Sequence, residues 1–195
     1  MQIMLKGSVE MVQRCAWANT GGQLLRDYHD HEWGKKVKDE RLIFELLSLE
    51  IMQAGLNWEL VLKKREAFKV AFDNFEITKV AAYDAAKVEE LCQNPAIIRN
   101  KRKIRAIITN AQAITTLHLA GTTLNKLLWQ LADNRTVINN WEHAEQVPAK
   151  TLFSKRVALE LQQKGFKFVG PTIVYSFLQA VGIINDHLSY CSFKY

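Results

Sequence analysis

Apolar residues recur at intervals of three and four positions through most of this chain, which is the spacing of one face of an α-helix. One such face runs through residues 40–53, and another, after Lys101, occupies positions 104, 107, 108, 111 and 114. We find no segment with the strict alternation of a half-buried strand, no internal repeat and no low-complexity tract. These patterns predict an all-α fold.

Helix-capping residues divide the chain into successive helices. Asp39 and Asn57 precede apolar-periodic segments, so we expect each side chain to cap the helix that follows. Asp84 and Thr123 stand in the same position farther along, and Gly121 is placed to end the preceding long helix. The predicted helices cover residues 40–53, 58–72, 85–91, 101–120, 124–132, 152–164 and 171–181, with a polar connection over 133–150.

The size and composition of the chain limit its class. With 195 residues, 48% of them hydrophobic, it can form one compact domain or two lobes that share a core. Three cysteines are an odd number, which argues against a secreted disulfide framework, and the N-terminus lacks a signal-peptide pattern. The longest uncharged run, residues 168–185, contains Gly170-Pro171 and several polar side chains, so we expect a buried helix and no membrane span. We therefore expect a cytoplasmic protein.

The net charge of +6 is concentrated in three basic clusters, at residues 63–65, 99–105 and 154–156. Such clusters are typical of a solvated surface, and equally of a surface that binds a polyanion and releases its counterions. Charge alone leaves both interpretations open.

Four residues of metal-ligand type lie near the two ends of the chain. His187 and Cys191 are four positions apart, which would put them on one face of a helix, and Cys15 and His29 lie near the other end. Together they form a Cys₂His₂ set that suits tetrahedral zinc. Residue types alone also allow buried thiols that act as small apolar groups and histidines with ordinary hydrogen bonds. We assign the third cysteine, Cys92, to the core.

Two further features are candidates for a functional site. Gly165 and Gly170 bracket a short hairpin between two predicted helices, which could direct backbone N–H groups at a phosphate or could be a plain turn. Glu50 interrupts an apolar helix face, and a buried carboxylate needs a partner or a function. A structural ion pair is the alternative for Glu50. Several aromatic residues occur near these features in the sequence, and they could line a pocket or belong to the core: Trp17, Tyr28, Trp33 and Trp58.

Five motifs, taken together, resemble one known family. They are RCAW (14–17), YHDHEWG (28–34), LEIMQAGLNWELVLKKRE (49–66), AIIRNKRKIRAIITNAQA (96–113) and GFKFVGPTIVYSFLQAVGIINDH (165–187). They resemble the type I 3-methyladenine DNA glycosylases of the helix-hairpin-helix superfamily. The resemblance runs from about Met11 to Cys191 and is weakest over residues 119–149. We interpret residues 1–10 as an N-terminal extension.

The resemblance implies a single glycosylase unit of residues 11–195. A helical lobe over 35–182 would carry the pocket and the hairpin, and a terminal unit of 11–34 and 183–195 would be closed by a structural zinc ion. The family's zinc ligands coincide with four residues here: Cys15, His29, His187 and Cys191. The metal would therefore join the two ends of the chain.

The same resemblance implies an activity and its residues. The chain would hydrolyse the N-glycosidic bond of 3-methyladenine in alkylated double-stranded DNA and release the free base without strand cleavage. Glu50 matches the family's pocket carboxylate, the catalytic candidate, and Tyr28, Trp58 and Trp17 match its base-binding side chains. We also expect a monomer. The DNA contacts implied are the Gly55-Leu56 turn, which would fill the gap left by the extruded base, and the hairpin residues Gly165, Lys167 and Gly170.

Departures from the family pattern keep alternatives open. Leu25, Arg102 and Pro171 stand where an aromatic residue, a glycine and a threonine are expected. One alternative is therefore a catalytically silent relative that recognises damaged bases, and another is a hydrolase with Cys15 or Cys191 as nucleophile. Asp186 follows the hairpin at an interval that looks short for a catalytic aspartate, so we expect it to orient groups near His187.

Overall fold

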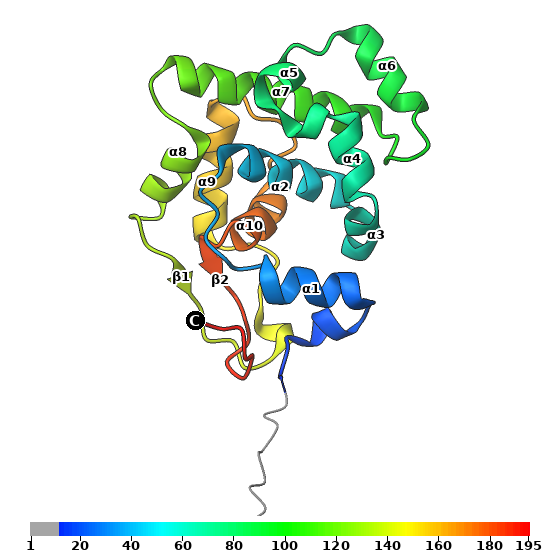
Figure 1. Ribbon diagram of the computed structural model, residues 1–195. Helices are drawn as coiled ribbons and strands as arrows, with labels where there is room; N and C mark the ends of the chain where they lie inside the picture. Colours follow the sequence, from blue (N-terminus) through cyan, green and yellow to red (C-terminus); the bar gives the residue numbers. More distant parts are fainter. Residues whose placement is uncertain (1–11) are drawn as a thin grey trace, which may run out of the picture.

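The computed structural model describes residues 12–195, so the predicted extension over residues 1–10 lies outside the described residues. The chain is mostly helical, as predicted (Figure 1). Its α-helices are α1 (Gln23–His31), α2 (Glu40–Gln53), α3 (Trp58–Lys63), α4 (Arg65–Ala71), α5 (Ile77–Ala81), α6 (Ala85–Gln93), α7 (Lys101–Leu119), α8 (Leu124–Leu131), α9 (Leu152–Gln163) and α10 (Pro171–Ala180). Short 3₁₀ turns lie at Ala16–Asn19, Asp73–Phe75 and Ala144–Gln146.

The predicted helix caps are confirmed. The Asp39 carboxylate accepts a hydrogen bond from the Leu42 amide at 2.7 Å, and the side chains of Asn57, Asp84 and Thr123 cap α3, α6 and α8 in the same way. Each bond satisfies one of the amides that a helix start leaves without a partner. The helix predicted over 58–72 is instead two helices, because the backbone at Lys64 leaves the helical region between α3 and α4.

The expectation of no strand is wrong at one place. β1 (Val137–Ile138) and β2 (Ile184–Asn185) form a parallel pair in which Val137 aligns with Ile184. Two residues are too few for a period-two pattern to be visible in a sequence. The pair matters for the site because it holds the chain extended immediately before Asp186 and His187.

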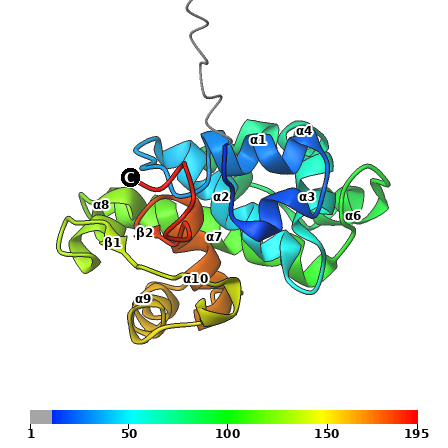
Figure 2. The same cartoon turned by 90° about the horizontal axis from the view of Figure 1, so that it is seen from below.

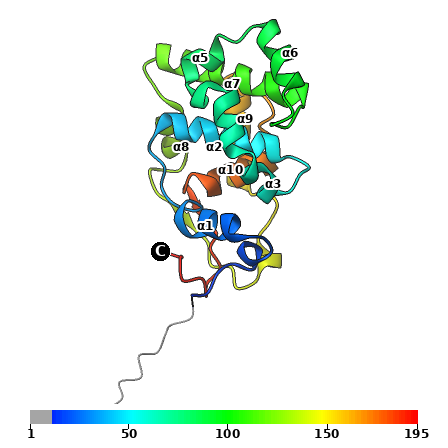
Figure 3. The same cartoon turned by 45° about the vertical axis from the view of Figure 1, so that its right-hand side comes forward.

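Helices α2 and α10 form the centre of the molecule. α10 packs against α2 and α9, while α7 packs against α2, α5 and α6 (Figures 1 and 3). Six phenylalanines are fully buried in this core, and each contributes about 1.5–3 kcal/mol of burial free energy: Phe44, Phe68, Phe72, Phe75, Phe166 and Phe177. The uncharged run over residues 168–185 forms α10, a turn and β2. Among residues 12–195, no helix has both the length and the apolar character needed to cross a membrane.

The N- and C-terminal segments of the described chain meet below α10, beside α1 (Figures 1 and 2). The Ser192 amide donates to the Gln13 carbonyl at 2.9 Å, and the Gln13 amide donates to the Ser192 hydroxyl at 3.0 Å. At the end of α10, Gly182 has φ +73°, and a Cβ there would lie 2.3 Å from the Lys35 carbonyl carbon. The close crossing of these two segments therefore requires glycine.

A buried asparagine fixes the hairpin between α9 and α10. Asn110 of α7 is fully buried; its Oδ1 accepts from the Lys167 amide at 2.7 Å and its Nδ2 donates to the Lys167 carbonyl at 3.1 Å. One side chain thus satisfies both the backbone N–H and the backbone carbonyl of Lys167. The side chain of Lys167 itself is exposed.

The Asn110→Ala substitution should lower the free energy of unfolding by about 2–3 kcal/mol, because it leaves two backbone groups without partners. Urea denaturation measures this loss. Gln112→Ala is the matched control on α7, since it removes a hydrogen bond to the Ala81 carbonyl at the surface and should change stability by less than about 0.5 kcal/mol. Equal losses of unfolding free energy in the two variants would contradict the role of Asn110 in fixing the hairpin.

Candidate metal centre and active-site cavity

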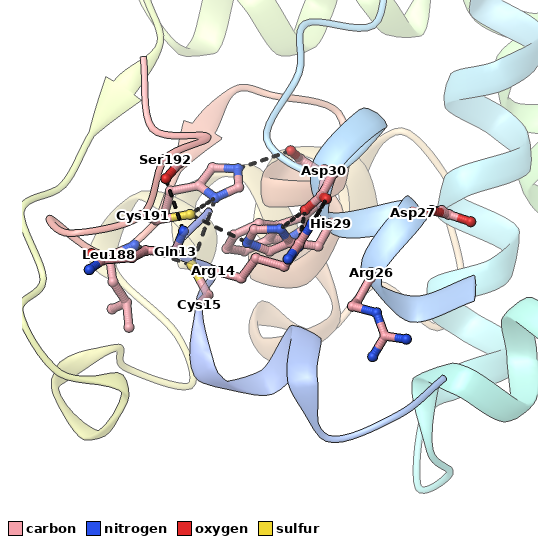
Figure 4. Close-up of polar contacts among 12 residues, drawn as sticks. Gln13, Arg14, Cys15, Arg26, Asp27, His29, Asp30, Leu188, Cys191 and Ser192 are labelled. Carbon is pink, nitrogen blue, oxygen red and sulfur yellow. Dashed lines mark hydrogen bonds and ion pairs between the residues drawn. The ribbon is translucent and has the colours of Figure 1, made fainter. Parts of the chain in front are cut away.

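Four ligand-type side chains from the two ends of the chain converge in one buried cluster. Their donor atoms all lie within 4.8 Å of one another, and each residue is at most 5% exposed: Cys15, His29, His187 and Cys191. Figure 4 shows Cys15 and Cys191 side by side, with His29 reaching the cluster from α1. The Cys191 sulfur lies 3.4 Å from Nδ1 of His187 and 3.6 Å from Nε2 of His29.

These distances fit one metal ion. A tetrahedral zinc ion with two sulfur and two nitrogen ligands requires donor–donor separations of about 3.3–3.8 Å. The two separations from Cys191 and the 3.7 Å from the Cys15 sulfur to Nδ1 of His187 fall within that range. The chemistry of the donor set therefore matches a closed four-ligand site, in which no coordination position is left for water or substrate.

Hydrogen bonds outside the cluster select the ring nitrogens that face it. Nδ1 of His29 lies 2.7 Å from the Asp30 carboxylate, and Nε2 of His187 lies 3.2 Å from the Trp33 carbonyl. A proton on each of these nitrogens leaves Nε2 of His29 and Nδ1 of His187 free as ligands. Arg14 holds Asp30 in turn, with contacts of 2.7–2.9 Å (Figure 4).

The same contacts affect the ionisation of the cluster. Although burial opposes it, the hydrogen bonds from Arg14 and His29 lower the pKa of Asp30, which keeps this carboxylate charged. Contact with Cys15, followed by contacts with the two histidines, lowers the pKa of the Cys191 thiol. A thiolate is the form that binds metal.

The helix expected over His187–Cys191 is not present. The segment is a loop with a turn, closed by a hydrogen bond from the Cys191 amide to the Leu188 carbonyl at 2.9 Å. The β1–β2 pair keeps the preceding residues extended, and Oδ1 of Asn185 accepts from the His187 amide at 3.2 Å. These nonlocal and turn-type bonds replace helical ones, yet both ligands still reach the cluster.

A cavity of about 280 Å³ lies next to the cluster, between the N-terminal segment, α1, α2, α3 and α10. Four of its lining residues are the predicted pocket residues Trp17, Tyr28, Glu50 and Trp58. Trp33, whose place in a pocket or in the core the sequence leaves open, also lines the cavity, and the lining residues that were not predicted are Gln53, Ser176 and Gln179. Leu25 is buried but is not among the lining residues.

Glu50 is the acidic group of this cavity. It lies on α2 among fully buried neighbours and is 5% exposed itself. No ion pair involves it in the part of the chain that the structure describes, so the structural ion pair considered above is absent there. Burial raises the pKa of Glu50 to about 8, because its environment disfavours an isolated charge.

Two aromatic side chains of the cavity carry polar atoms without a hydrogen-bond partner among residues 12–195. They are the Tyr28 hydroxyl and the Trp58 Nε1, both buried. The two rings lie 5.2 Å apart between centroids and are tilted by 58°. A buried polar group without a partner costs about 1–3 kcal/mol, so these atoms indicate a site for a ligand. Desolvation raises the pKa of Tyr28, which keeps its hydroxyl protonated as a donor.

Metal-ligand and cavity residues lie close together along the N-terminal part of the chain. Cys15 stands two positions before Trp17, and Tyr28 stands immediately before His29. A metal ion held by the cluster would thereby fix the same backbone segments that form one wall of the cavity.

A tight turn follows α2 beside the cavity. Gly55 has φ +78°, which favours glycine, and the next side chain, Leu56, is 39% exposed. Gln53 closes the turn, since its carbonyl accepts from the Leu56 amide at 2.7 Å and its Nε2 donates to the Leu56 carbonyl at 3.2 Å. Lys103 of α7 is buried below the turn and donates to two carbonyls of the α2 end, those of Met52 and Ala54, at 2.9 and 2.7 Å.

The remaining predicted contact residues lie at the hairpin. Gly165 has φ +90° and follows α9, and Gly170 is the N-cap of α10. Pro171 is the first residue of α10, a position where its missing N–H is harmless. Arg102 lies in the first turn of α7, where its amide donates to the Asn100 cap at 3.1 Å.

Comparison with known proteins assigns the family. The family model described as methyladenine glycosylase matches residues 17–195. The chain belongs to the methyladenine glycosylase family.

Two curated relatives cover nearly the whole chain. The chain is 37% identical over 184 residues to the DNA-3-methyladenine glycosylase of Haemophilus influenzae, covering 94% of this chain and 99% of that protein. It is 39% identical over 180 residues to DNA-3-methyladenine glycosylase 1 of Escherichia coli K12, covering 92% and 96%.

Solved structures of family members share the fold. A crystal structure of 3-methyladenine DNA glycosylase I matches with a TM-score of 0.91 at 41% identity, covering 94% of this chain and all of that one. A variant of a 3-methyladenine DNA glycosylase I in complex with 3-methyladenine matches with a TM-score of 0.89 at 35% identity, covering 93% and 97%. The Staphylococcus aureus enzyme, solved to explain 3-methyladenine recognition, matches with a TM-score of 0.88 at 36% identity, covering 93% and 96%.

We expect this methyladenine glycosylase family member to bind one metal ion per chain. Cys191→Ala should abolish that stoichiometry and lower the melting temperature by about 10 °C or more, because the two chain ends lose their cross-link. Elemental analysis and a thermal melt of the purified protein measure both effects. Cys92→Ala, at a half-buried cysteine outside the cluster, is the control and should keep the metal. The site would be refuted if the wild-type protein contained no metal and melted at the same temperature as Cys191→Ala.

Proposed function

We propose that this chain is a DNA-3-methyladenine glycosylase, which hydrolyses the bond between 3-methyladenine and deoxyribose in alkylated double-stranded DNA. The observation that carries the proposal is the cavity, which contains a buried carboxylate without a cation and two donors without acceptors. Its volume lies just below the range of about 300–1,000 Å³ that holds drug-sized ligands, which suits a single extruded base. Membership of the methyladenine glycosylase family supports the same substrate.

Glu50 would select the base by charge. Methylation at N3 makes the bound adenine cationic, and a buried carboxylate stabilises a cation far more than it does neutral adenine. The bond then breaks with departure of a neutral base, so strong protonation of the leaving group is unnecessary. The role of Glu50 would be to bind and orient the base and to stabilise positive charge near the breaking bond.

The aromatic walls would contribute to the same selection. Tyr28 and Trp58 lie close enough to form adjacent walls of the cavity, and the Trp17 ring lies 6.4 Å from that of Tyr28. A cationic base between such rings gains stacking and cation–π attraction, which neutral adenine gains only in part. The free Tyr28 hydroxyl and Trp58 Nε1 are donors that acceptor nitrogens of a purine can satisfy.

The metal cluster would hold zinc in a structural role. Two cysteines and two histidines are a preferred zinc set, and four such ligands leave no open coordination position. When bound, zinc supplies a cross-link between the chain ends rather than chemistry on the substrate. The hydrolase alternative with a cysteine nucleophile finds no support, since both thiols face the histidines of the cluster.

Two surface features would bind the DNA. The half-exposed Leu56, on a turn that Gln53 and Lys103 hold in place, is suited to enter the gap left by the extruded base. The hairpin of Gly165, Lys167 and Gly170 would contact a phosphate, as in helix-hairpin-helix proteins. Lys167 is exposed and is not among the cavity-lining residues, which supports a monofunctional enzyme without a Schiff base to the sugar.

The purified chain should release 3-methyladenine from methylated duplex DNA, with intact strands before alkaline treatment. Glu50→Gln should lower the single-turnover rate by about 100-fold or more, since the amide cannot ionise to give the negative charge that a bound cationic base favours. Chromatography of the released bases measures the rate. Glu66→Gln, at an exposed glutamate of α4, is the control and should keep the wild-type rate. Binding without release by the wild-type chain would instead identify the catalytically silent relative.

The same Glu50→Gln substitution should raise stability in a pH-dependent way. In the folded chain Glu50 keeps its proton up to about pH 8. In the unfolded chain it releases this proton near pH 4.5. The contribution of this proton to the free energy of unfolding is fully present below about pH 4.5 and is lost as pH rises to about 8. The variant cannot ionise, so it should be more stable than the wild type by about 2–4 kcal/mol at pH 7.5. The difference should shrink towards zero near pH 4.5 in urea denaturation.

A further inference from the structure

Gln179 is a polar residue of the cavity that neither the motifs nor the proposed chemistry uses. It lies near the end of α10, is 9% exposed, and lines the same cavity as Glu50. It also lines a smaller neighbouring cavity of about 160 Å³, which shares the walls Trp17 and Trp33. A buried amide between two cavities is held there by specific partners.

The partner of the Gln179 amide is the buried Asp186. Nε2 of Gln179 donates to Oδ2 of Asp186 at 2.5 Å. The same carboxylate accepts from Nδ2 of Asn139 at 2.7 Å, from Nε1 of Trp141 at 2.8 Å, and from the Tyr175 hydroxyl. Asp186 therefore orients four neutral donors, and no hydrogen bond among residues 12–195 joins its carboxylate to the His187 ring.

These contacts determine which end of the Gln179 amide faces Asp186. Asp186 accepts hydrogen bonds from Asn139, Trp141 and Tyr175, so the NH₂ group must be the end of the Gln179 amide that meets it. The main chain at this position is fixed as well, since the Gln179 carbonyl accepts from the amides of Gly34 and Gly182, each at 3.1 Å. No donor among residues 12–195 reaches Oε1, which is left as the acceptor that Gln179 offers to a ligand.

We propose that Gln179 determines specificity for the exocyclic amine of the base, with its Oε1 acting as a second acceptor beside Glu50. This inference rests on the proposed function and deepens it. An adenine-type base carries two protons on that amine, and two acceptors from α2 and α10 can bind them together. Asp186 is the positioning residue that keeps the amide from turning over.

The arrangement discriminates against 6-oxo purines. A guanine-type base has a carbonyl oxygen where adenine has the amine, so its oxygen would face the acceptor oxygen of Gln179 and find no proton. A site built to accept a hydrogen bond discriminates strongly against a ligand that cannot donate one. Gln179 thus separates 3-methyladenine from 3-methylguanine, two lesions that have the same methyl position and the same charge.

The test is a competition between the two lesions in one sample of methylated duplex DNA. The ratio of the released bases gives the ratio of kcat/KM values, which does not depend on how much of a variant is folded. In Gln179→Met, which keeps the length of the side chain without its amide, this ratio should fall about 10- to 100-fold toward 3-methylguanine. A ratio within twofold of the wild type would overturn the proposal.

Two further variants separate specificity from structure. Tyr175→Phe removes a donor from Asp186, as Gln179→Met does, but Tyr175 lines neither cavity. Its ratio should stay within twofold of the wild type, and a fall equal to that of Gln179→Met would assign the effect to Asp186 and overturn the proposal. In Asp186→Asn, position 186 offers an N–H to Gln179, so the Gln179 amide can turn over and present a donor to the cavity. The ratio should then fall at least as far as in Gln179→Met.

The outcomes also separate this inference from the proposed function. If the wild-type chain releases no methylated base, the proposed function fails. If the wild type releases 3-methyladenine and Gln179→Met leaves the ratio unchanged, only the role of Gln179 fails.

Discussion

The convergence of two cysteines and two histidines is the contact on which the arrangement of this molecule depends. Cys15 and His29 come from the N-terminal segment, and His187 and Cys191 come from the loop after β2. Nothing else in the described chain brings four ligand-type atoms together with so little exposure. Because the two pairs of residues are separated by well over a hundred positions, a metal ion bound to the cluster would close a loop that contains the entire helical core, and closing such a loop restricts the unfolded chain substantially.

The position of the cluster also gives the cavity its rigidity. The segments that carry the ligands carry Trp17, Tyr28 and Trp33 as well, so the aromatic wall is part of the region that a bound metal ion would cross-link. The opposite wall comes from α2 and α10, the central helices of the core. A cavity with both walls fixed can keep Glu50, Tyr28 and Trp58 in an unfavourable, partnerless state, because relaxation toward a partner is blocked. That free energy becomes available when a ligand of matching charge and hydrogen-bonding pattern enters.

The parts of the structure that could be predicted from the sequence are those that depend on local signals. Asp39 and Asn57 cap helices through partners two or three residues away, and the motifs quoted above contain Glu50, Tyr28 and Trp58 in a recognisable order. The failures involve distant partners. Asn110 binds a peptide group 57 residues away, and Asp186 binds Asn139 at a separation of 47. Gln179 gave no signal because it is one of several polar residues in α10, and its partner Asp186 lies on another segment.

The buried Lys103 has a consequence for how the basic charge of this protein should be counted. Lys103 is 5% exposed and its ammonium group is bound to two carbonyls at the end of α2, whereas its neighbours Arg102 and Arg105 are exposed. A charge enclosed in this way neutralises no phosphate and releases no ion from a nucleic acid. The salt sensitivity of DNA association should therefore reflect the exposed basic side chains of this region alone, with Lys103 contributing nothing to its slope.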